Sequence, residues 1–203
     1  MKVLSIDIGI TNLGYVYGEI SYPSYRLSNL YLKNNNLSEF INIFDCNRVD
    51  ITHVKHNTVK RCDCQLNHES CIPDYVDHFI QENNYLFESA EIILIERQPP
   101  VGITNVQDLL FTKFRSKVIM VSPNSVHKYF YLPKDYSMRK IESEKIASSF
   151  LNNFKQFSDN LRKHDISDSM LMLIYYHSLK SEENFKKNKN TIINFEFFRF
   201  IKN

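Results

Sequence analysis

The distribution of apolar residues predicts five β-strands. Residues 2–8, 91–96 and 117–121 form short, nearly continuous apolar runs, which are typical of buried strands. Residues 13–20 and 25–32 are rich in Tyr, Val, Leu and Ile, and they predict two further strands in a meander with the first.

Helical spacing of apolar residues is found between and after the later strands. It predicts helices at residues 74–83, 104–114 and 138–154, a helix that starts near Pro123, and a last clear helix at residues 165–179. This order of elements predicts an α/β fold in which a mixed five-stranded sheet is flanked by helices.

Two other parts of the chain carry less pattern. Residues 39–70 show no regular period, and the charged residues 181–190 are typical of a linker. The tail at residues 190–203 is rich in aromatic side chains, and the alternatives for it are an added strand and a contact between subunits. We therefore expect a single domain over residues 1–203, with its core in about residues 1–180.

The composition agrees with one globular domain. The chain has 203 residues, of which 43% are hydrophobic and 24% are charged. Its longest apolar run, Met170–Tyr176, is too short to span a membrane. The first residues lack the pattern of a signal peptide, so we expect an intracellular protein without a membrane partner.

A cluster of cysteines suggests a zinc site as one possibility. Its candidate ligands are Cys62, Cys64, His68 and Cys71. The Cys-x-Cys spacing argues against zinc, because zinc-binding pairs usually leave about two to four residues between the ligands. Reduced cysteines without a metal are the favoured alternative, since an intracellular chain of this size needs no disulfides.

Charge is unevenly distributed along the chain. Residues 34–112 carry 12 acidic and 5 basic side chains, whereas residues 113–163 carry 11 basic and 4 acidic ones. The second stretch is a candidate for contacts with phosphates. On composition alone, an ordinary solvated basic surface explains it equally well.

Three segments place carboxylates where they can act together. Asp7 and Glu96 each end an apolar strand, and ligands bind at the carboxyl ends of parallel strands in open α/β sheets. Asp165 and Asp168 lie three residues apart at the start of an apolar helix, so they share one helix face. Taken singly, each feature also has a structural explanation, because Asp-x-Gly suits a turn and acidic residues stabilise helix N-termini.

Taken together, the four carboxylates predict a metal centre. Asp7 is costly to bury unless it is paired or binds a metal, and Gly9 after it lets a phosphate or metal approach the backbone. Four carboxylates can bind two divalent ions, and oxygen ligands favour Mg²⁺ or Mn²⁺. Two such ions, about 3.5–4 Å apart, stabilise the attacking and leaving oxygens of a phosphodiester during hydrolysis.

Four motifs, in this order along the chain, resemble those of the poxvirus-type Holliday junction resolvases. They are Asp7-Ile-Gly-Ile-Thr-Asn12, Ile95-Glu-Arg-Gln-Pro-Pro-Val-Gly102, Val121-Ser-Pro-Asn-Ser-Val-His-Lys128 and Lys163-His-Asp-Ile-Ser-Asp168. Those resolvases are similar to bacterial RuvC and belong to the RNase H-like superfamily. The resemblance covers most of the chain and implies an RNase H-like fold.

The resemblance also implies a function. It implies a homodimer with one active site per subunit, paired symmetric nicks in four-way DNA junctions, and 5′-phosphate and 3′-hydroxyl ends. In this reading Asp7, Glu96, Asp165 and Asp168 bind two Mg²⁺ ions, for which Mn²⁺ can substitute. The enzyme would resolve viral replication and recombination intermediates, such as concatemers, in the host cytoplasm.

Basic residues near these motifs are further candidates. The family uses a catalytic lysine, for which Lys128 matches by its Val-x-Lys context while Lys140 competes at a helix start. Either can neutralise charge that develops on the phosphate. The candidate DNA contacts are Arg97, Gln98, Lys134, Arg139, Lys140 and Lys163. For each of these, a solvated surface side chain is the alternative.

Other functions compete with junction resolution. Another RNase H-like nuclease, which cuts flaps or the RNA of hybrids, would use the same four carboxylates. A sugar-kinase or actin-like phosphotransferase shares the Asp-x-Gly-x-Thr-Asn pattern, but needs a second domain and more glycines than this chain has. A non-catalytic junction-binding module conflicts with the four carboxylates, which are costly to bury.

Overall fold

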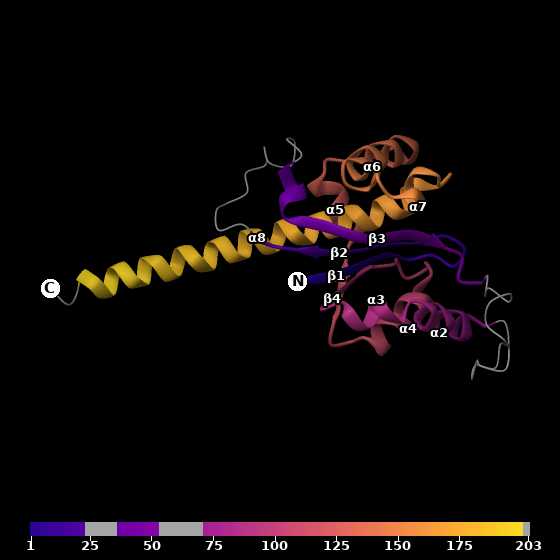
Figure 1. The fold of residues 1–203 in the computed structure, drawn as a ribbon, viewed down its shortest axis with the longest axis horizontal. Helices are drawn as coiled ribbons and strands as arrows, with labels where there is room; N and C mark the ends of the chain where they lie inside the picture. Colours follow the sequence, from indigo (N-terminus) through magenta and orange to yellow (C-terminus); the bar gives the residue numbers. More distant parts are fainter. Residues whose placement is uncertain (23–35, 53–70, 201–203) are drawn as a thin grey trace.

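A mixed five-stranded sheet forms the centre of the protein (Figure 1). The computed structural model describes residues 1–22, 36–52 and 71–200. Along the sheet the strands follow the order β3-β2-β1-β4-β5. The prediction of a mixed five-stranded α/β sheet is confirmed.

The two halves of the sheet differ in strand direction. β1 (Lys2–Asp7), β2 (Leu13–Ile20) and β3 (Ile41–Val49) form an antiparallel meander. β4 (Ile92–Glu96) runs parallel to β1, and β5 (Val118–Val121) runs parallel to β4. The parallel half therefore brings the carboxyl ends of β1 and β4 to the same edge.

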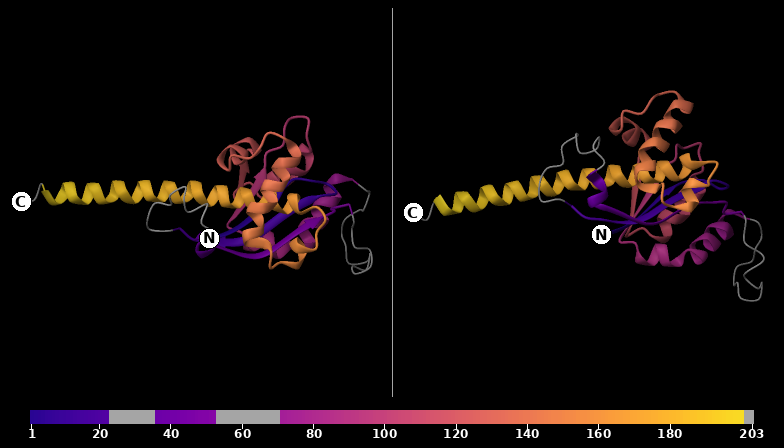
Figure 2. Two further views of the ribbon diagram at one scale, coloured as in Figure 1. Left: turned by 90° about the horizontal axis from the view of Figure 1, so that it is seen from above. Right: turned by 45° about the horizontal axis from the view of Figure 1, so that its top comes forward.

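Helices cover both faces of the sheet (Figures 1 and 2). One face carries α2 (Ile72–Glu82), α3 (Asn84–Ser89) and α4 (Thr104–Lys113). The other carries α5 (Pro123–Tyr129), α6 (Tyr136–Leu151), α7 (Lys155–Ser158) and the first half of α8 (Lys163–Phe200). A short 3₁₀-helix, η1 (Asn36–Glu39), precedes β3. The predicted helices at residues 74–83, 104–114 and 138–154 correspond to α2, α4 and α6.

Side chains that alternate along the central strands build a core on each face. Val3 of β1 and Leu94 of β4 belong to the core under α5–α8, while Leu4 and Ile93 belong to the core over α2–α4. All four are at most 1% exposed. Burial on both faces explains why β1 and β4 are nearly continuous apolar runs in the sequence, with Ser5 as the buried polar exception in β1.

The third strand of the meander is not where the sequence predicted it. The predicted strand at residues 25–32 lies outside the described residues. β3, at Ile41–Val49, falls within the stretch that showed no period. Asn42, Asp45 and Asn47 interrupt its apolar pattern, and the pairing with β2 shifts register between Tyr17 and Gly18. An edge strand with an irregular register needs no strict alternation.

Helix α8 is longer than predicted. It runs without a break from Lys163 to Phe200, and its second half projects away from the sheet (Figures 1 and 2). The predicted linker at residues 181–190 is therefore wrong. Ion pairs within the helix support it there: Lys180–Glu183 at 2.7 Å and Lys186–Glu182 at 3.1 Å.

The helical backbone also rules out an added strand for the tail up to Phe200. The subunit contact proposed for residues 190–203 stays a prediction. In the described ranges of the chain, no helix combines the length and the apolar character that crossing a membrane requires.

Candidate active site

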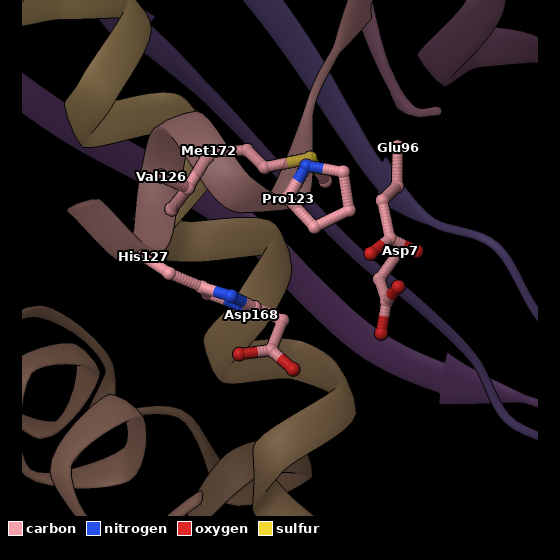
Figure 3. A pocket seen from close by; sticks show the side chains of 7 residues that line it. All are labelled: Asp7, Glu96, Pro123, Val126, His127, Asp168 and Met172. Carbon is pink, nitrogen blue, oxygen red and sulfur yellow. The ribbon is translucent and has the colours of Figure 1, made fainter. Parts of the chain in front are cut away.

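A pocket lies where β1 and β4 end and α5 and α8 cross the sheet (Figure 3). Its acidic members come from three elements: Asp7 ends β1, Glu96 ends β4, and Asp168 lies in the second turn of α8. In Figure 3, Asp7 and Glu96 lie side by side and Asp168 faces them across the pocket. The remaining lining residues are Pro123, Val126, His127 and Met172.

The parallel pairing of β1 and β4 brings Asp7 and Glu96 together. Ile6 pairs with Ile95 in the register of the two strands, so the next residue on each strand is a carboxylate. The sequence predicted this meeting on the condition that the strands were parallel neighbours. That condition is met, and the two carboxyl groups interact directly.

Ser169 fastens α8 to the two central strands at the level of Asp7. Its hydroxyl oxygen accepts a hydrogen bond from the Asp7 backbone N–H at 3.0 Å and donates to the Gly14 carbonyl at 3.0 Å. The Ser5 hydroxyl donates to the Ser169 carbonyl at 2.7 Å. All three contacts are long-range in sequence, so the position of Asp168 on α8 is fixed relative to Asp7 on β1.

Gly14 allows the first turn of α8 to approach the sheet. It pairs with Asp7 across β1 and β2. A Cβ atom at Gly14 would lie 2.1 Å from the Asp165 carbonyl oxygen and 2.4 Å from its carbonyl carbon. Gly9 serves the loop after β1 instead, since a Cβ there would lie 2.4 Å from the Asn12 carbonyl oxygen. Both glycines are therefore required by the backbone itself.

The pocket is electrostatically unfavourable without a cation. Burial raises the pKa of Asp7 well above its usual value, and the charges of Glu96, Asp168 and Asp165 add to that effect. Burial also raises the pKa of Asp168 to about 7, although Ser143 and Arg139 counteract part of the shift. Carboxylates that repel one another in a buried pocket suit a divalent cation, so this donor set fits the predicted metal.

Asp165 is held by neighbouring basic side chains. Its two carboxylate oxygens contact Arg162 Nε at 3.1 Å and His164 Nε2 at 3.2 Å. Its side chain does not line the pocket, although its charge raises the pKa of Asp7. Within residues 1–22, 36–52 and 71–200, no three His, Cys, Asp or Glu side chains stand close enough to form a complete metal shell. An ion shared by all four carboxylates therefore requires Asp7, Glu96 and Asp168 to close around it and Asp165 to change partners.

Helix α6 supports the first turns of α8 with two pairs of side chains. Arg139 and Ser143 both lower the pKa of Asp168. One position further along the helix, Lys140 acts electrostatically on His164, and Glu144 Oε1 lies 3.7 Å from His164 Nδ1. The four-residue spacing places each pair on one face of α6. Arg139, predicted as a DNA contact, is thus placed beside the pocket.

The other residues predicted to contact DNA lie in different environments. Gln98 Nε2 donates to Glu96 Oε2 at 2.6 Å, so Gln98 orients a pocket carboxylate. Arg97 and Lys134 are exposed. Lys163 Nζ lies 5.6 Å from the centre of the Phe157 ring.

The two candidate lysines occupy different environments. Lys128 is exposed in the last turn of α5. Lys140 is partly buried near the start of α6, and its Nζ lies 4.2 Å from the centre of the Tyr136 ring. Only Lys140 acts electrostatically on a neighbour of Asp165, namely His164.

Comparison with known proteins adds evidence about the fold. The sequence matches no model of a known protein family, and no curated protein matches it either. Several solved structures are similar, and three of them are compared with this chain. The fowlpox virus resolvase in complex with substrate Holliday junction DNA is 19% identical with a TM-score of 0.54, and the alignment covers 88% of this chain and 99% of the resolvase. A second structure of the fowlpox virus Holliday junction resolvase is 16% identical with a TM-score of 0.56, and the alignment covers 87% of this chain and 98% of the resolvase. Thermus thermophilus RuvC is 14% identical with a TM-score of 0.51, covering 89% and 98%.

The chain has the RuvC-like resolvase fold. The expected RNase H-like architecture is therefore confirmed. The similarity extends over nearly the full length of the compared chains, so the described domain accounts for the whole of that fold.

One lining residue of this RuvC-like fold was missed in the sequence. His127 lies in the pocket beside Asp168 (Figure 3). Burial and the charge of Arg139 lower its pKa, which favours the neutral imidazole. It directly precedes Lys128 in the third motif, and Pro123 starts the helix that carries it. That position in the motif was the available signal, but the motif predicts only Lys128 as a functional residue.

The zinc site predicted as one possibility stays a prediction, because most of its candidate ligands are not among the described residues. Cys62, Cys64 and His68 lie outside the described residues. Cys71 is a free cysteine directly before α2.

Without divalent ions, the protein is expected to lose stability as the pH rises from about 4 to about 7. A carboxyl group with a raised pKa in the folded chain stabilises the fold fully below its unfolded pKa, and this contribution is lost as the pH passes the folded pKa, about 7 for Asp168. Asp7 acts in the same direction. In EDTA, the melting temperature of the wild-type protein should decline more steeply with rising pH over this range than that of the Asp168→Asn variant.

Mg²⁺ at pH 7.5 should raise the melting temperature of the wild-type protein more than that of the Asp168→Asn variant, because the cation neutralises the pocket carboxylates. Parallel profiles for the two proteins, with and without Mg²⁺, would contradict the proposed electrostatics of the pocket.

Proposed function

We propose that the protein is a metal-dependent endonuclease that resolves four-way DNA junctions. The observation that carries this proposal is the meeting of Asp7, Glu96 and Asp168 around one pocket, with Asp165 alongside, in a chain with the RuvC-like resolvase fold. One of the similar structures is described as a complex of a viral resolvase with Holliday junction DNA. Homodimerisation, a preference for Mg²⁺, 5′-phosphate and 3′-hydroxyl products, and action on viral intermediates in the host cytoplasm belong to the same proposal.

In this proposal Asp7, Glu96, Asp165 and Asp168 hold the metal ions. Bound ions of this kind lower the pKa of the attacking water and stabilise the leaving oxygen. The chain itself supplies rigidity: Ser169 fixes the backbone of Asp7, and Gln98 fixes the carboxylate of Glu96. These two bonds restrain Asp7 and Glu96 before a metal binds, whereas Asp165 must first release Arg162 and His164.

Basic side chains near the pocket would bind the phosphates on either side of the cleaved bond. Arg139 is placed for this role because its charge reaches both Asp168 and His127. The neutral imidazole of His127 can donate or accept a hydrogen bond beside Asp168.

The first test is cleavage of a labelled four-way DNA junction in Mg²⁺. We expect paired symmetric nicks that Asp7→Asn abolishes, and no comparable cutting of a linear duplex of the same sequence. Junction binding without cleavage would indicate a non-catalytic binding module. Equal cutting of the duplex, or preferential cutting of a flap or an RNA–DNA hybrid, would replace junction resolution with another nuclease activity.

Between the two candidate lysines, Lys140 is expected to affect the chemical step. Lys140→Ala should lower the single-turnover cleavage rate at saturating protein by about tenfold or more, because Lys140 lies near the acidic end of α8. Lys128→Ala should leave that rate within about threefold of the wild type. Both substitutions remove one positive charge, so each is the matched control for the other. A larger loss with Lys128→Ala would reverse the assignment.

A further inference from the structure

Tyr131 adopts a backbone conformation that tyrosine rarely takes. Its φ is 54°, and it is the one non-glycine residue with a positive φ in the part of the chain that the structure describes. It lies in the loop between α5 and α6, and its side chain is 88% exposed. The left-handed region is unfavourable for any residue with a Cβ atom, and bulky residues there are uncommon.

Two hydrogen bonds explain the conformation. The Tyr131 N–H donates to the Lys128 carbonyl at 3.3 Å, and the Leu132 N–H donates to the His127 carbonyl at 2.9 Å. This pair of bonds is the Schellman motif, which ends a helix and in which glycine usually takes the left-handed position. Tyrosine therefore stands where the backbone favours glycine.

No internal contact explains the choice of tyrosine. Among the described residues, the structure gives the Tyr131 side chain no hydrogen bond, aromatic contact or cation–π contact, and the ring faces solvent. Tyr136, the next tyrosine, differs in this respect, because its ring lies under Arg139 and Lys140. The ring of Tyr131 is therefore exposed on a strained backbone and open to an external partner.

Tyr131 lies in a basic stretch of the chain that is connected to the pocket. The hydrogen bond from the Leu132 N–H to the His127 carbonyl ties the loop at Tyr131 to His127, whose side chain lines the pocket. Residues 128–140 contain four basic side chains and a single acidic one, Asp135. The Asp135 carboxylate is occupied in capping α6, where it accepts from the Met138 N–H at 2.9 Å.

We propose that Tyr131 stacks on a nucleobase at the branch point of the DNA substrate, while basic side chains of residues 128–140 bind the adjoining phosphates. This inference rests on the proposed function. A base at a branch point is easier to unstack than one inside a duplex, and an exposed aromatic ring beside cations is the arrangement that binds unstacked bases. The role assigned to Tyr131 is therefore recognition of the branched structure.

The backbone strain at Tyr131 allows a test that separates loss of DNA binding from loss of folding. Tyr131→Gly removes the ring and also the Cβ atom that makes a positive φ unfavourable. The melting temperature of this variant should therefore equal or exceed that of the parent protein. A loss of DNA binding by this variant cannot then be attributed to misfolding. Tyr131→Phe and Tyr131→Leu share the strained backbone with the parent and differ from each other in the aromatic ring.

The experiment measures junction binding in the Asp7→Asn background by fluorescence anisotropy. We expect Tyr131→Gly and Tyr131→Leu to weaken binding to the four-way junction by at least about fivefold, as loss of a base-stacking ring does. Tyr131→Phe should stay within about twofold, and binding to a linear duplex should change little. Tyr85→Leu is the control, because Tyr85 is also an exposed tyrosine (55%) but lies on α3, on the opposite face of the sheet.

A second readout locates the contact. A junction with 2-aminopurine at the branch point should show a fluorescence change with the parent protein and with Tyr131→Phe, but a much smaller one with Tyr131→Gly. Equal junction affinity for the parent and Tyr131→Gly would overturn the inference and leave the proposed function intact. A parent protein that does not prefer the junction over the duplex would overturn the proposed function, and the inference with it. Equal losses on junction and duplex would also overturn the inference, since they indicate a general phosphate contact.

Discussion

Glu96→Gln is expected to lower the rate of junction cleavage by at least about a thousandfold. Glutamine keeps the size of the side chain but loses the negative charge that a metal ligand needs. Glu96 ends β4 next to Asp7, and Gln98 Nε2 donates to its carboxylate at 2.6 Å, so the substitution removes one charge from the centre of the acidic set. The loss should appear in the single-turnover rate at saturating protein.

Junction binding should survive this substitution, because the DNA contacts depend on basic side chains outside the acidic set. The matched control is Glu91→Gln, which makes the same change just before the opposite end of β4. Glu91 accepts a hydrogen bond from the Lys2 backbone N–H and lies 4.0 Å from the terminal amine, far from the pocket edge of the strand. Substantial cleavage by Glu96→Gln would remove Glu96 from the metal site.

Strands buried on both faces could be predicted from the sequence, and the pocket carboxylates with them. β4 carries apolar residues at four successive positions and β1 is interrupted only by Ser5, so a carboxylate at the end of each run stands out. β3 could not be predicted in this way, because one edge strand with polar residues and a register shift has no clean period. The strand order itself became evident only from the pairing of β1 with β4.

The length of α8 shows a different limit of sequence patterns. Residues 181–190 are charged and lack an apolar stripe, which led to the incorrect prediction of a linker. Salt bridges between residues three and four apart stabilise the helix there without burial. A search for apolar periodicity gives such a segment no weight, although the spacing of its charges contained the information.

The orientation of the acidic side chains also depends on tertiary contacts. Asp165 and Asp168 share one face of α8, as the spacing predicted, yet only Asp168 lines the pocket. Arg162 and His164 hold the carboxylate of Asp165 through contacts that involve its immediate neighbours in sequence. Spacing along a helix fixes the face, whereas the rotamer is decided by these local partners.

Gly14→Ala is expected to destabilise the fold by at least about 3 kcal/mol and to disrupt the active site in the molecules that still fold. The added Cβ would overlap the Asp165 carbonyl group. Both this Cβ and the carbonyl are fixed to the backbone, so neither can rotate away as the end of a flexible side chain could. The first turn of α8 must then shift away from β2. That shift separates Ser169 from the Gly14 carbonyl and moves Asp168 relative to Asp7.

Gly18→Ala on the same strand is the control that separates the two effects. Its Cβ would lie 2.6 Å from the Asn42 carbonyl oxygen on β3, at the edge of the sheet away from the pocket. Both variants should unfold at lower urea concentration than the wild type. Of these two glycines only Gly14 contacts the start of α8, so Mg²⁺ should raise the melting temperature of Gly18→Ala but have little effect on Gly14→Ala. Equal stabilisation of the two variants by Mg²⁺ would mean that the approach of α8 to β2 does not set the geometry of the carboxylates.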